Sequence, residues 1–186
     1  MKKLIASVAL AAVIGSAAVA QQQKAPAEAT AFVTKVAASN AFEIQSSQLA
    51  GDRAEQADVK SFAKQMIDDH TKAGQDFKSA VQAANMTAPP DDPDAKQKAE
   101  IKKLQNARGR SFDQAYVSAQ RQAHEEAVSL FRAYASNGAG GPLKEFAQRT
   151  LPTLERHLKM TQDLNQQIST ASQARACNEC EDDGCS

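Results

Sequence analysis

Apolar residues recur every three to four positions along most of this chain, which is the spacing of an amphipathic helix rather than the alternation of a strand. The pattern predicts long helices within residues 29–50, 57–84, 111–137 and 143–168, and a short, mostly charged helix within 93–108. Helix-ending residues stand at each main break: Gly51-Asp52, the proline-containing segment 85–93 and the glycine-rich segment 137–142.

These elements predict an all-α protein, a ferritin-like up-down-up-down four-helix bundle with an extra short helix before the third long helix. We assign residues 29–172 to this single bundle domain. In this arrangement the connections near 51–57 and 137–142 are expected at the same end of the bundle. Because His and Glu residues on the long helices lie well inside both connections, they would share one layer or two adjacent layers of the core.

The composition sharpens this picture in two respects. Aromatic residues make up only 5% of the chain and Trp is absent, so the core is expected to consist mainly of Ala, Leu, Val and a few Phe. The 22 Lys and Arg residues are balanced by 22 Asp and Glu residues. We therefore expect no nucleic-acid partner, because such partners favour basic surfaces.

The N-terminal residues have the pattern of a secretory signal peptide, which we assign to residues 1–20. Lys2 and Lys3 precede an apolar run from Leu4 to Gly15, and Ala18-Val19-Ala20 forms the small-residue cleavage pattern. That run is shorter than the roughly 20 residues of a transmembrane helix, and no later segment is long and apolar enough. We expect an exported, periplasmic protein without a transmembrane segment, with residues 21–28 as a flexible lead-in.

The three histidines are the main candidates for chemistry, because each falls on the apolar face of a different predicted helix, while the first helix places a glutamate on its own apolar face. Imidazole and carboxylate groups that converge inside a bundle can bind a transition-metal ion, here copper, zinc or iron. Nearby thioethers would favour copper. The candidate ligands are Glu43, His70, His124 and His157, with Met66 and Met160 as weaker candidates.

A purely structural role is the alternative for the same residues. Buried histidines can hydrogen-bond to one another, to Glu43 and to Asn40, Gln120 or Thr161, and so form a polar layer that specifies how the helices align.

Four segments resemble, in the same order, an exported bacterial family called domain of unknown function 4142: 32–43, 59–70, 116–124 and 150–158. The resemblance covers about residues 30–165, and it implies export and a bundle similar to ferritin-like proteins. The chain departs from the di-iron pattern of such bundles, because Ile67, Arg121 and Leu154 stand where Glu-x-x-His motifs would need Glu. We therefore expect at most a mononuclear site.

The predicted bundle is followed by residues 173–186, which we expect to be a disordered acidic tail. The tail carries Cys177, Cys180 and Cys185 in a C-x2-C-x4-C arrangement. In an oxidising compartment this spacing favours one local disulfide and one remaining thiol, and a metal-binding tail is the alternative.

These features leave three classes of function. The first is a non-enzymatic interaction or envelope-stress module that has a structural His/Glu layer and binds an unknown protein partner or itself. The alternative is a metal-binding bundle for storage, transfer or stress protection. An enzyme with a metal in the bundle core is the third class, although the chain has no Gly-rich phosphate loop, His-Glu-x-x-His or Gly-x-Ser-x-Gly motif. No catalytic residue is assigned.

Overall fold

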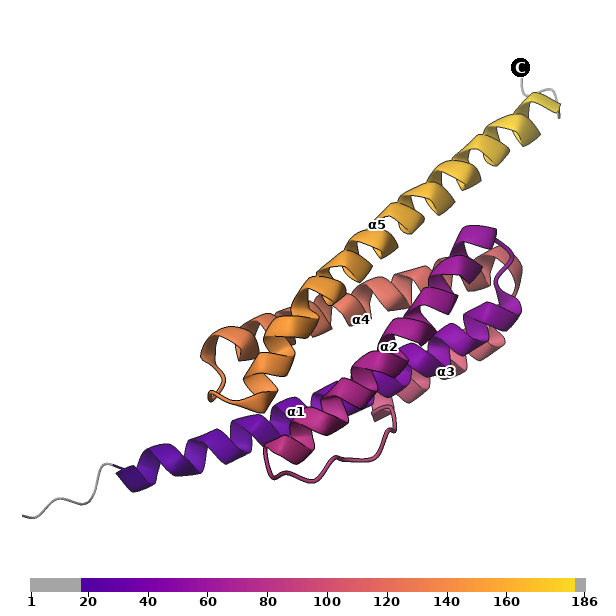
Figure 1. Ribbon diagram of the computed structural model, residues 1–186. Coiled ribbons are helices and arrows are strands. Elements are labelled where there is room, and N and C mark those ends of the chain that lie inside the picture. Colours follow the sequence, from indigo (N-terminus) through magenta and orange to yellow (C-terminus); the bar gives the residue numbers. More distant parts are fainter. Residues whose placement is uncertain (1–17, 183–186) are drawn as a thin grey trace, which may run out of the picture.

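The computed structural model describes residues 18–182, which form five helices joined by loops (Figure 1). No strand occurs within this range, so the all-α prediction is confirmed. The elements are α1 (Ala18–Arg53), α2 (Ala57–Ala83), α3 (Ala95–Asn106), α4 (Gly109–Asn137) and α5 (Pro142–Asp182).

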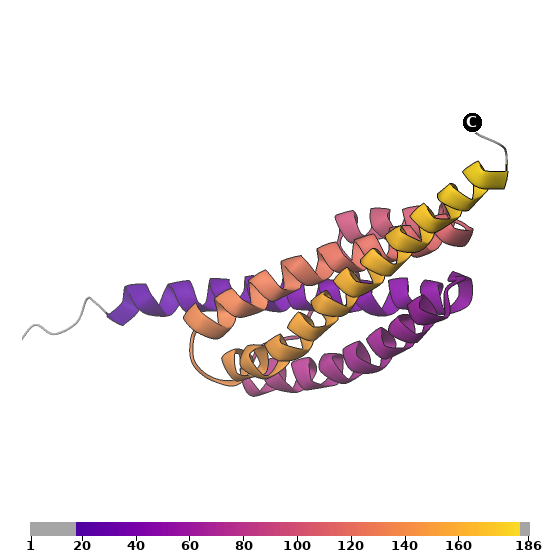
Figure 2. The same ribbon diagram turned by 90° about the horizontal axis from the view of Figure 1, so that it is seen from above.

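The four long helices form a bundle in which α1 packs against α2 and α4, and α5 packs against the same two helices from the opposite corner (Figures 1 and 2). The short helix α3 lies outside the ring and contacts α1 and α4. The four-helix bundle with an extra short helix before the third long helix is therefore confirmed.

The direction of α4 differs from the predicted up-down-up-down order of the helices. The Asp113 carboxylate on α4 accepts hydrogen bonds from the backbone N–H groups of Glu55 and Gln56, so α4 begins beside the α1–α2 loop. At the other end Tyr134 stacks on Phe32, near the start of the packed part of α1. Hence α4 runs parallel to α2, and the connections near 51–57 and 137–142 lie at opposite ends of the bundle.

The segment between α2 and α4 explains this direction. Residues 84–108 cross the length of the bundle before α4 starts, and α3 alone advances the chain by about 18 Å at 1.5 Å per residue. A bundle with one such long crossover is connected in the manner of ferritin-like folds. His70 and His124 lie near the middle of α2 and α4, and His157 lies near the middle of the part of α5 that packs in the bundle. The reversed direction of α4 therefore leaves all three at the same level.

The core consists mainly of two apolar clusters, one toward each end of the bundle. The cluster beside the α4–α5 loop is rich in aromatic rings and includes Phe32, Phe77, Phe131, Tyr134 and Phe146. The cluster beside the α1–α2 loop includes Val59, Phe62, Met66, Phe112, Tyr116 and Ile168. The histidines lie between these clusters, at the middle of the bundle.

The two outer ends of the bundle helices extend further than predicted. Residues 21–28, expected as a flexible lead-in, belong to α1, and residues 173–182, expected as part of a disordered tail, belong to α5. Residues 21–28 are rich in Gln and Ala, and residues 173–182 include Ala, Gln, Arg and Glu, all of which favour helices. Each stretch continues a helix that is already nucleated by packing. Figure 1 shows both ends projecting beyond the packed helices. Residues 1–17, most of the predicted signal peptide, lie outside the described residues.

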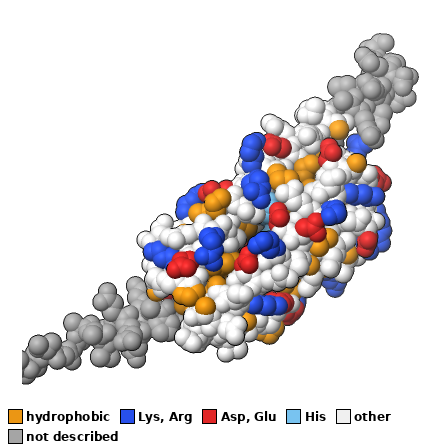
Figure 3. Space-filling model, viewed as in Figure 1, with side chains coloured by type: hydrophobic (Ala, Val, Ile, Leu, Met, Phe, Trp, Pro, Cys, Tyr) orange, Lys and Arg blue, Asp and Glu red, His pale blue; other side chains and the backbone are white. Residues whose placement is uncertain are grey.

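The face of the bundle in Figure 3 carries basic and acidic side chains interspersed rather than in separate fields. Many of them form pairs along one helix, such as Lys64–Asp68 at 2.7 Å and Lys159–Asp163 at 3.0 Å. Among the described helices, none combines the length and the apolar character that crossing a membrane requires.

Candidate metal centre

The structure brings the three histidines together in the bundle core. His70 lies on α2, His124 on α4 and His157 on α5, and their side chains are 6%, 0% and 1% exposed. One potential ligand nitrogen from each ring lies within 4.8 Å of those of the other two rings. We call these residues the trihistidine cluster.

Each ring of the trihistidine cluster uses one nitrogen as a donor to an oxygen atom of the surrounding protein. The acceptors are a side-chain amide, a backbone carbonyl and a carboxylate, and these hydrogen bonds set the orientation of each ring. The pairs are His70 Nδ1 with Asn40 Oδ1 at 3.1 Å, His124 Nδ1 with Gln120 O at 2.9 Å, and His157 Nε2 with Asp69 Oδ2 at 2.9 Å.

The second nitrogen of every ring is buried and has no hydrogen-bond partner among the described residues: His70 Nε2, His124 Nε2 and His157 Nδ1. Because the opposite nitrogen of each ring donates its hydrogen, these three atoms carry lone pairs. A buried polar atom without a partner is costly, and three of them in one cluster call for an explanation. A metal ion bound by all three nitrogens would supply it.

Burial keeps the three rings neutral, which is the form that binds metal ions. Desolvation lowers the pKa of His124 to about 4 and lowers that of His70 well below its ordinary value. The pKa of His157 is also lowered by burial, although the neighbouring Asp69 carboxylate opposes the shift. Protons therefore compete weakly with a metal ion at neutral pH.

The spacing of the cluster is close to that of a three-imidazole site. Bonds of about 2.0–2.1 Å to a tetrahedral or trigonal ion place the ligand nitrogens about 3.3–3.6 Å apart. The limit of 4.8 Å found here requires movements of no more than about an ångström, which side-chain rotation supplies. Three protein ligands leave a fourth position of a tetrahedral ion open.

Glu43 is buried beside the cluster but does not join it. Its side chain is 1% exposed, and the oxygen Oε1 lies 3.7 Å from Nδ1 of His124, the nitrogen that already donates to the Gln120 carbonyl. Neither carboxylate oxygen makes a hydrogen bond of good geometry among the described residues, and burial raises the pKa of Glu43 to about 8, although the neighbouring Gln120 side chain opposes the shift. The structure therefore places Glu43 beside His124 but outside the group of three ring nitrogens that could hold a metal ion.

The two methionine candidates belong to the apolar cluster beside the α1–α2 loop. Met66 is buried in the apolar cluster around Tyr116, and Met160 packs against the edge of the same cluster. Cys177 and Cys180 fall on the last turns of α5, but their side chains lie outside the described part of the structure, as does Cys185. The predictions for the three cysteines stay predictions.

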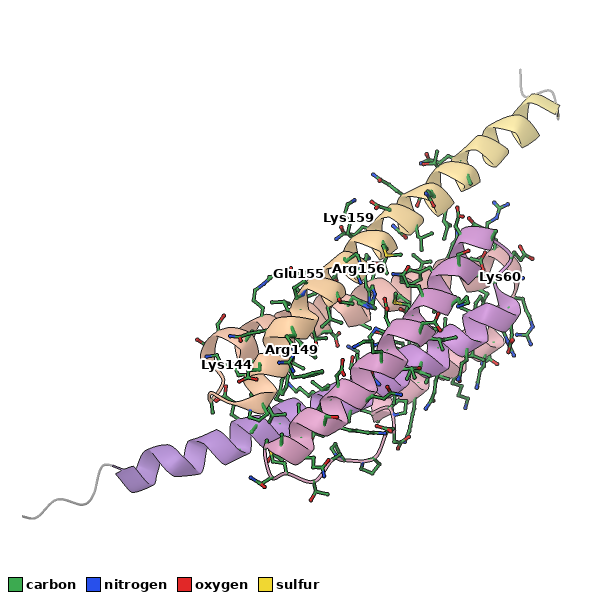
Figure 4. The ribbon with its side chains drawn as sticks, in the orientation of Figure 1. Lys60, Lys144, Arg149, Glu155, Arg156 and Lys159 are labelled. Carbon is green, nitrogen blue, oxygen red and sulfur yellow. The ribbon has the colours of Figure 1, made fainter. Side chains whose placement is uncertain are left out.

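One hydrogen-bond partner of the trihistidine cluster was not identified in the sequence analysis. Asp69 precedes His70 on α2, yet its carboxylate serves His157 on α5 and lies 3.8 Å from Arg156, the α5 side chain labelled in Figure 4. Its side chain is 34% exposed, so it connects the buried cluster to the surface. In the sequence, only the position of Asp69 next to His70 could have suggested this contact. Acidic residues on helix surfaces are too common to be informative by themselves.

The fold and the site define a class: an all-α four-helix bundle with a buried trihistidine cluster at its middle. The family model described as Domain of unknown function (DUF4142) matches residues 15–164, and the chain belongs to that family. This confirms the resemblance seen in the sequence.

Comparison with solved structures extends the likeness to a second family. The bundle is similar to the crystal structure of a DUF305 protein from Streptomyces coelicolor that is described as secreted, with a TM-score of 0.63 and 16% sequence identity. The match covers 74% of this chain and 90% of that chain, and it shows a shared fold. A sequence comparison with curated proteins finds no match.

Proposed function

We propose that this protein binds one transition-metal ion, copper, zinc or iron, through His70 Nε2, His124 Nε2 and His157 Nδ1. The proposal depends on one observation about the two nitrogens of each ring. One nitrogen donates a hydrogen bond to an oxygen of the protein, and the other is buried and has no partner among the described residues. The structural polar layer predicts the bonds to Asn40 and Gln120 as well, but it would also pair the second nitrogen of each ring, with another histidine, Glu43 or Thr161. Binding for storage, transfer or stress protection is the role that such a site supports.

The charge around the site fits a cation. Asp69 hydrogen-bonds to His157 and supplies negative charge at the edge of the cluster, and such carboxylate–histidine pairs strengthen metal binding. Imidazole is a good ligand for copper, zinc and iron alike. The thioethers of Met66 and Met160 take no part in this proposal.

Elemental analysis of the protein purified without chelator tests the proposal. We expect about one equivalent of metal, lost in the single variants His124→Gln and His70→Gln, which keep most of the side-chain volume. A variant that ends before Cys177 controls for metal held by the cysteines and should keep its metal. Circular dichroism checks that each variant is folded.

Apoprotein titrated with Zn²⁺, Cu²⁺ and Fe²⁺ identifies the preferred ion. Protein that stays metal-free, and that takes up none of the three ions in these titrations, contradicts the proposal. The trihistidine cluster would then be a structural layer, and the interaction or envelope-stress module would be the function to pursue. Metal lost only in the shortened variant contradicts the proposal as well, because the tail would then hold it.

We also propose that the protein acts after export to the periplasm. The basic start, apolar run and small-residue cleavage pattern of residues 1–20 support this. Mass spectrometry of protein from a periplasmic fraction should find Gln21 at the N-terminus. Full-length protein confined to the cytoplasm would contradict export.

A further inference from the structure

Gly74 lies in the interior of α2, close to the trihistidine cluster. A glycine inside a helix is destabilising compared with alanine, because it loses more conformational freedom on folding and has no side chain to pack. Gly74 follows His70 by four residues, so the two lie one turn apart on the same face of α2. On that face Gly74 meets Asn40, a residue of α1.

The side chain of Asn40 occupies the space that a side chain at position 74 would take. A Cβ atom built on Gly74 would lie 2.9 Å from Asn40 Nδ2 and 3.8 Å from Asn40 Cγ. Within residues 18–182 no other heavy atom lies within 4 Å of that point, apart from the adjoining residues and the backbone of α2 itself. The glycine therefore does not serve a close approach of two helix backbones. It makes room for the amide group of Asn40.

The same amide group orients His70. Its oxygen Oδ1 accepts a hydrogen bond from His70 Nδ1 at 3.1 Å, which keeps the ring hydrogen on Nδ1 and leaves a lone pair on Nε2. Because an amide group is planar and rigid, a displacement of Nδ2 also displaces Oδ1. Without this acceptor, the hydrogen can move to Nε2. Both forms of the ring are neutral, but only the first can bind a metal ion through Nε2.

We propose that Gly74 is a positioning residue of the metal site, which acts through Asn40 to keep the hydrogen of His70 on Nδ1. This inference rests on the proposed function. A methyl group at position 74 would displace only the end of one side chain, so the fold should tolerate it. The displaced amide would lose its hydrogen bond to the ring, and Nε2 would no longer be held ready for a metal ion.

Affinity for Zn²⁺, measured by competition with a coloured chelator, tests the proposal. We expect Gly74→Ala to weaken zinc binding about tenfold or more, as is typical when a metal ligand loses its hydrogen-bond partner. Asn40→Ala should weaken it by a similar factor. In the Asn40→Ala background, Gly74→Ala should change the affinity by less than about twofold, because no amide remains to be displaced. Circular dichroism checks that each variant is folded.

Nitrogen NMR of the histidine rings in the metal-free protein provides a second readout. Ring nitrogen shifts distinguish a nitrogen that carries hydrogen from one that does not, and the His70→Gln variant assigns the signals. We expect the hydrogen of His70 on Nδ1 in the wild type, and on Nε2 or exchanging between both nitrogens in Gly74→Ala. Gly51→Ala is the matched control, because a Cβ atom at Gly51 on α1 meets nothing within 4 Å. It should match the wild type in both measurements.

The outcomes separate the two proposals. Gly74→Ala protein that keeps the zinc affinity of the wild type, or that keeps the His70 hydrogen on Nδ1, overturns this inference and leaves the metal site standing. An equal loss of affinity from Gly74→Ala with and without Asn40 overturns it too, because the glycine would then act on another group. Failure of the wild-type protein to bind zinc, copper or iron overturns both proposals.

Discussion

Two buried polar regions of this bundle differ in one respect, which is whether their hydrogen-bonding groups are satisfied. At the α1–α2 loop the Asp113 carboxylate is fully buried and accepts hydrogen bonds from the backbone of Glu55 and Gln56 at 2.9–3.2 Å. At the middle of the bundle, three ring nitrogens and both oxygens of Glu43 are equally buried and have no partner among the described residues.

If the protein binds metal as proposed, this difference separates a structural role from a binding role. Asp113 fixes the start of α4 against the α1–α2 loop, and its hydrogen bonds account for its burial. The trihistidine cluster and Glu43 reduce the stability of the empty protein, because unsatisfied buried groups cost about 1–3 kcal/mol each. Sites that bind ligands often carry such a cost, which binding then offsets.

Replacing Asp113, whose carboxylate has its hydrogen-bond partners, should have the largest effect on the free energy of unfolding. Asp113→Ala leaves two backbone N–H groups without an acceptor, and we expect a loss of about 2–4 kcal/mol in the free energy of unfolding. Urea denaturation measures it, with Asp52→Ala at the exposed end of α1 as the control. Metal affinity should be unchanged. A loss below about 1 kcal/mol would show that the loop is held by other contacts.

The stability of the metal-free protein should depend on pH through the trihistidine cluster. The pKa of His124 is lowered to about 4 in the folded state, so its neutral form stabilises the protein above pH 6.5, and that contribution is lost as the pH falls toward 4. By pH 5 the loss from His124 is about 2 kcal/mol. His70 and His157 act in the same direction, with Asp69 opposing the shift at His157.

Glu43 opposes this trend, because its pKa is raised to about 8 and its burial destabilises the protein increasingly as the pH rises from 4.5. The variant Glu43→Gln should therefore lose stability between pH 7 and pH 5 more steeply than the wild type. Urea denaturation with chelator at several pH values measures both. Stability of the variant that stays constant from pH 7 to pH 5 would mean that the rings are not buried as neutral groups.

Replacing Asp69, which connects the trihistidine cluster to the surface, should change metal affinity rather than the free energy of unfolding. Asp69→Asn weakens the acceptor for His157, and we expect metal affinity to fall about 10- to 100-fold. Asp68→Asn is the matched control, because Asp68 is the adjacent residue and pairs with Lys64 on the surface. Competition with a coloured chelator measures both. Equal affinities for the two variants would exclude a role for Asp69 in the site.

Replacing a methionine thioether should have the smallest effect on stability and metal affinity. Met66→Leu preserves the volume of a buried side chain and should cost less than about 1.5 kcal/mol of stability, with no change in metal affinity. The same competition experiment checks this. A large loss of copper affinity would return Met66 to the ligand set.

The fold could be predicted largely from spacing, since the apolar stripes define the long helices and the prolines and glycines separate them. The direction of α4 could not, because it depends on the path of residues 84–108 across the bundle. No local pattern encodes that path. Helix continuation at residues 21–28 and 173–182 was also missed, because stretches without large apolar residues resemble linkers even when they contain residues that favour helices.

The candidate site was partly predictable. The convergence of His70, His124 and His157 followed from their places on the apolar faces. Asn40 and Gln120 were expected as hydrogen-bond partners, and both take that role, Gln120 through its backbone carbonyl. Asp69 and the offset of Glu43 depend on how helices rotate against each other, by fractions of a turn that spacing does not resolve.

The place of α5 in the chain order also determines when the trihistidine cluster comes into being. Two of the histidines precede α5, and two imidazoles alone are a weak site, so the proposed metal site would gain high affinity only when α5 docks between α2 and α4. If the chain is exported as proposed, α5 follows α1, α2 and α4 across the membrane. Assembly order would then delay metal capture until folding is complete, and the ion would be chosen from the pool available in that compartment.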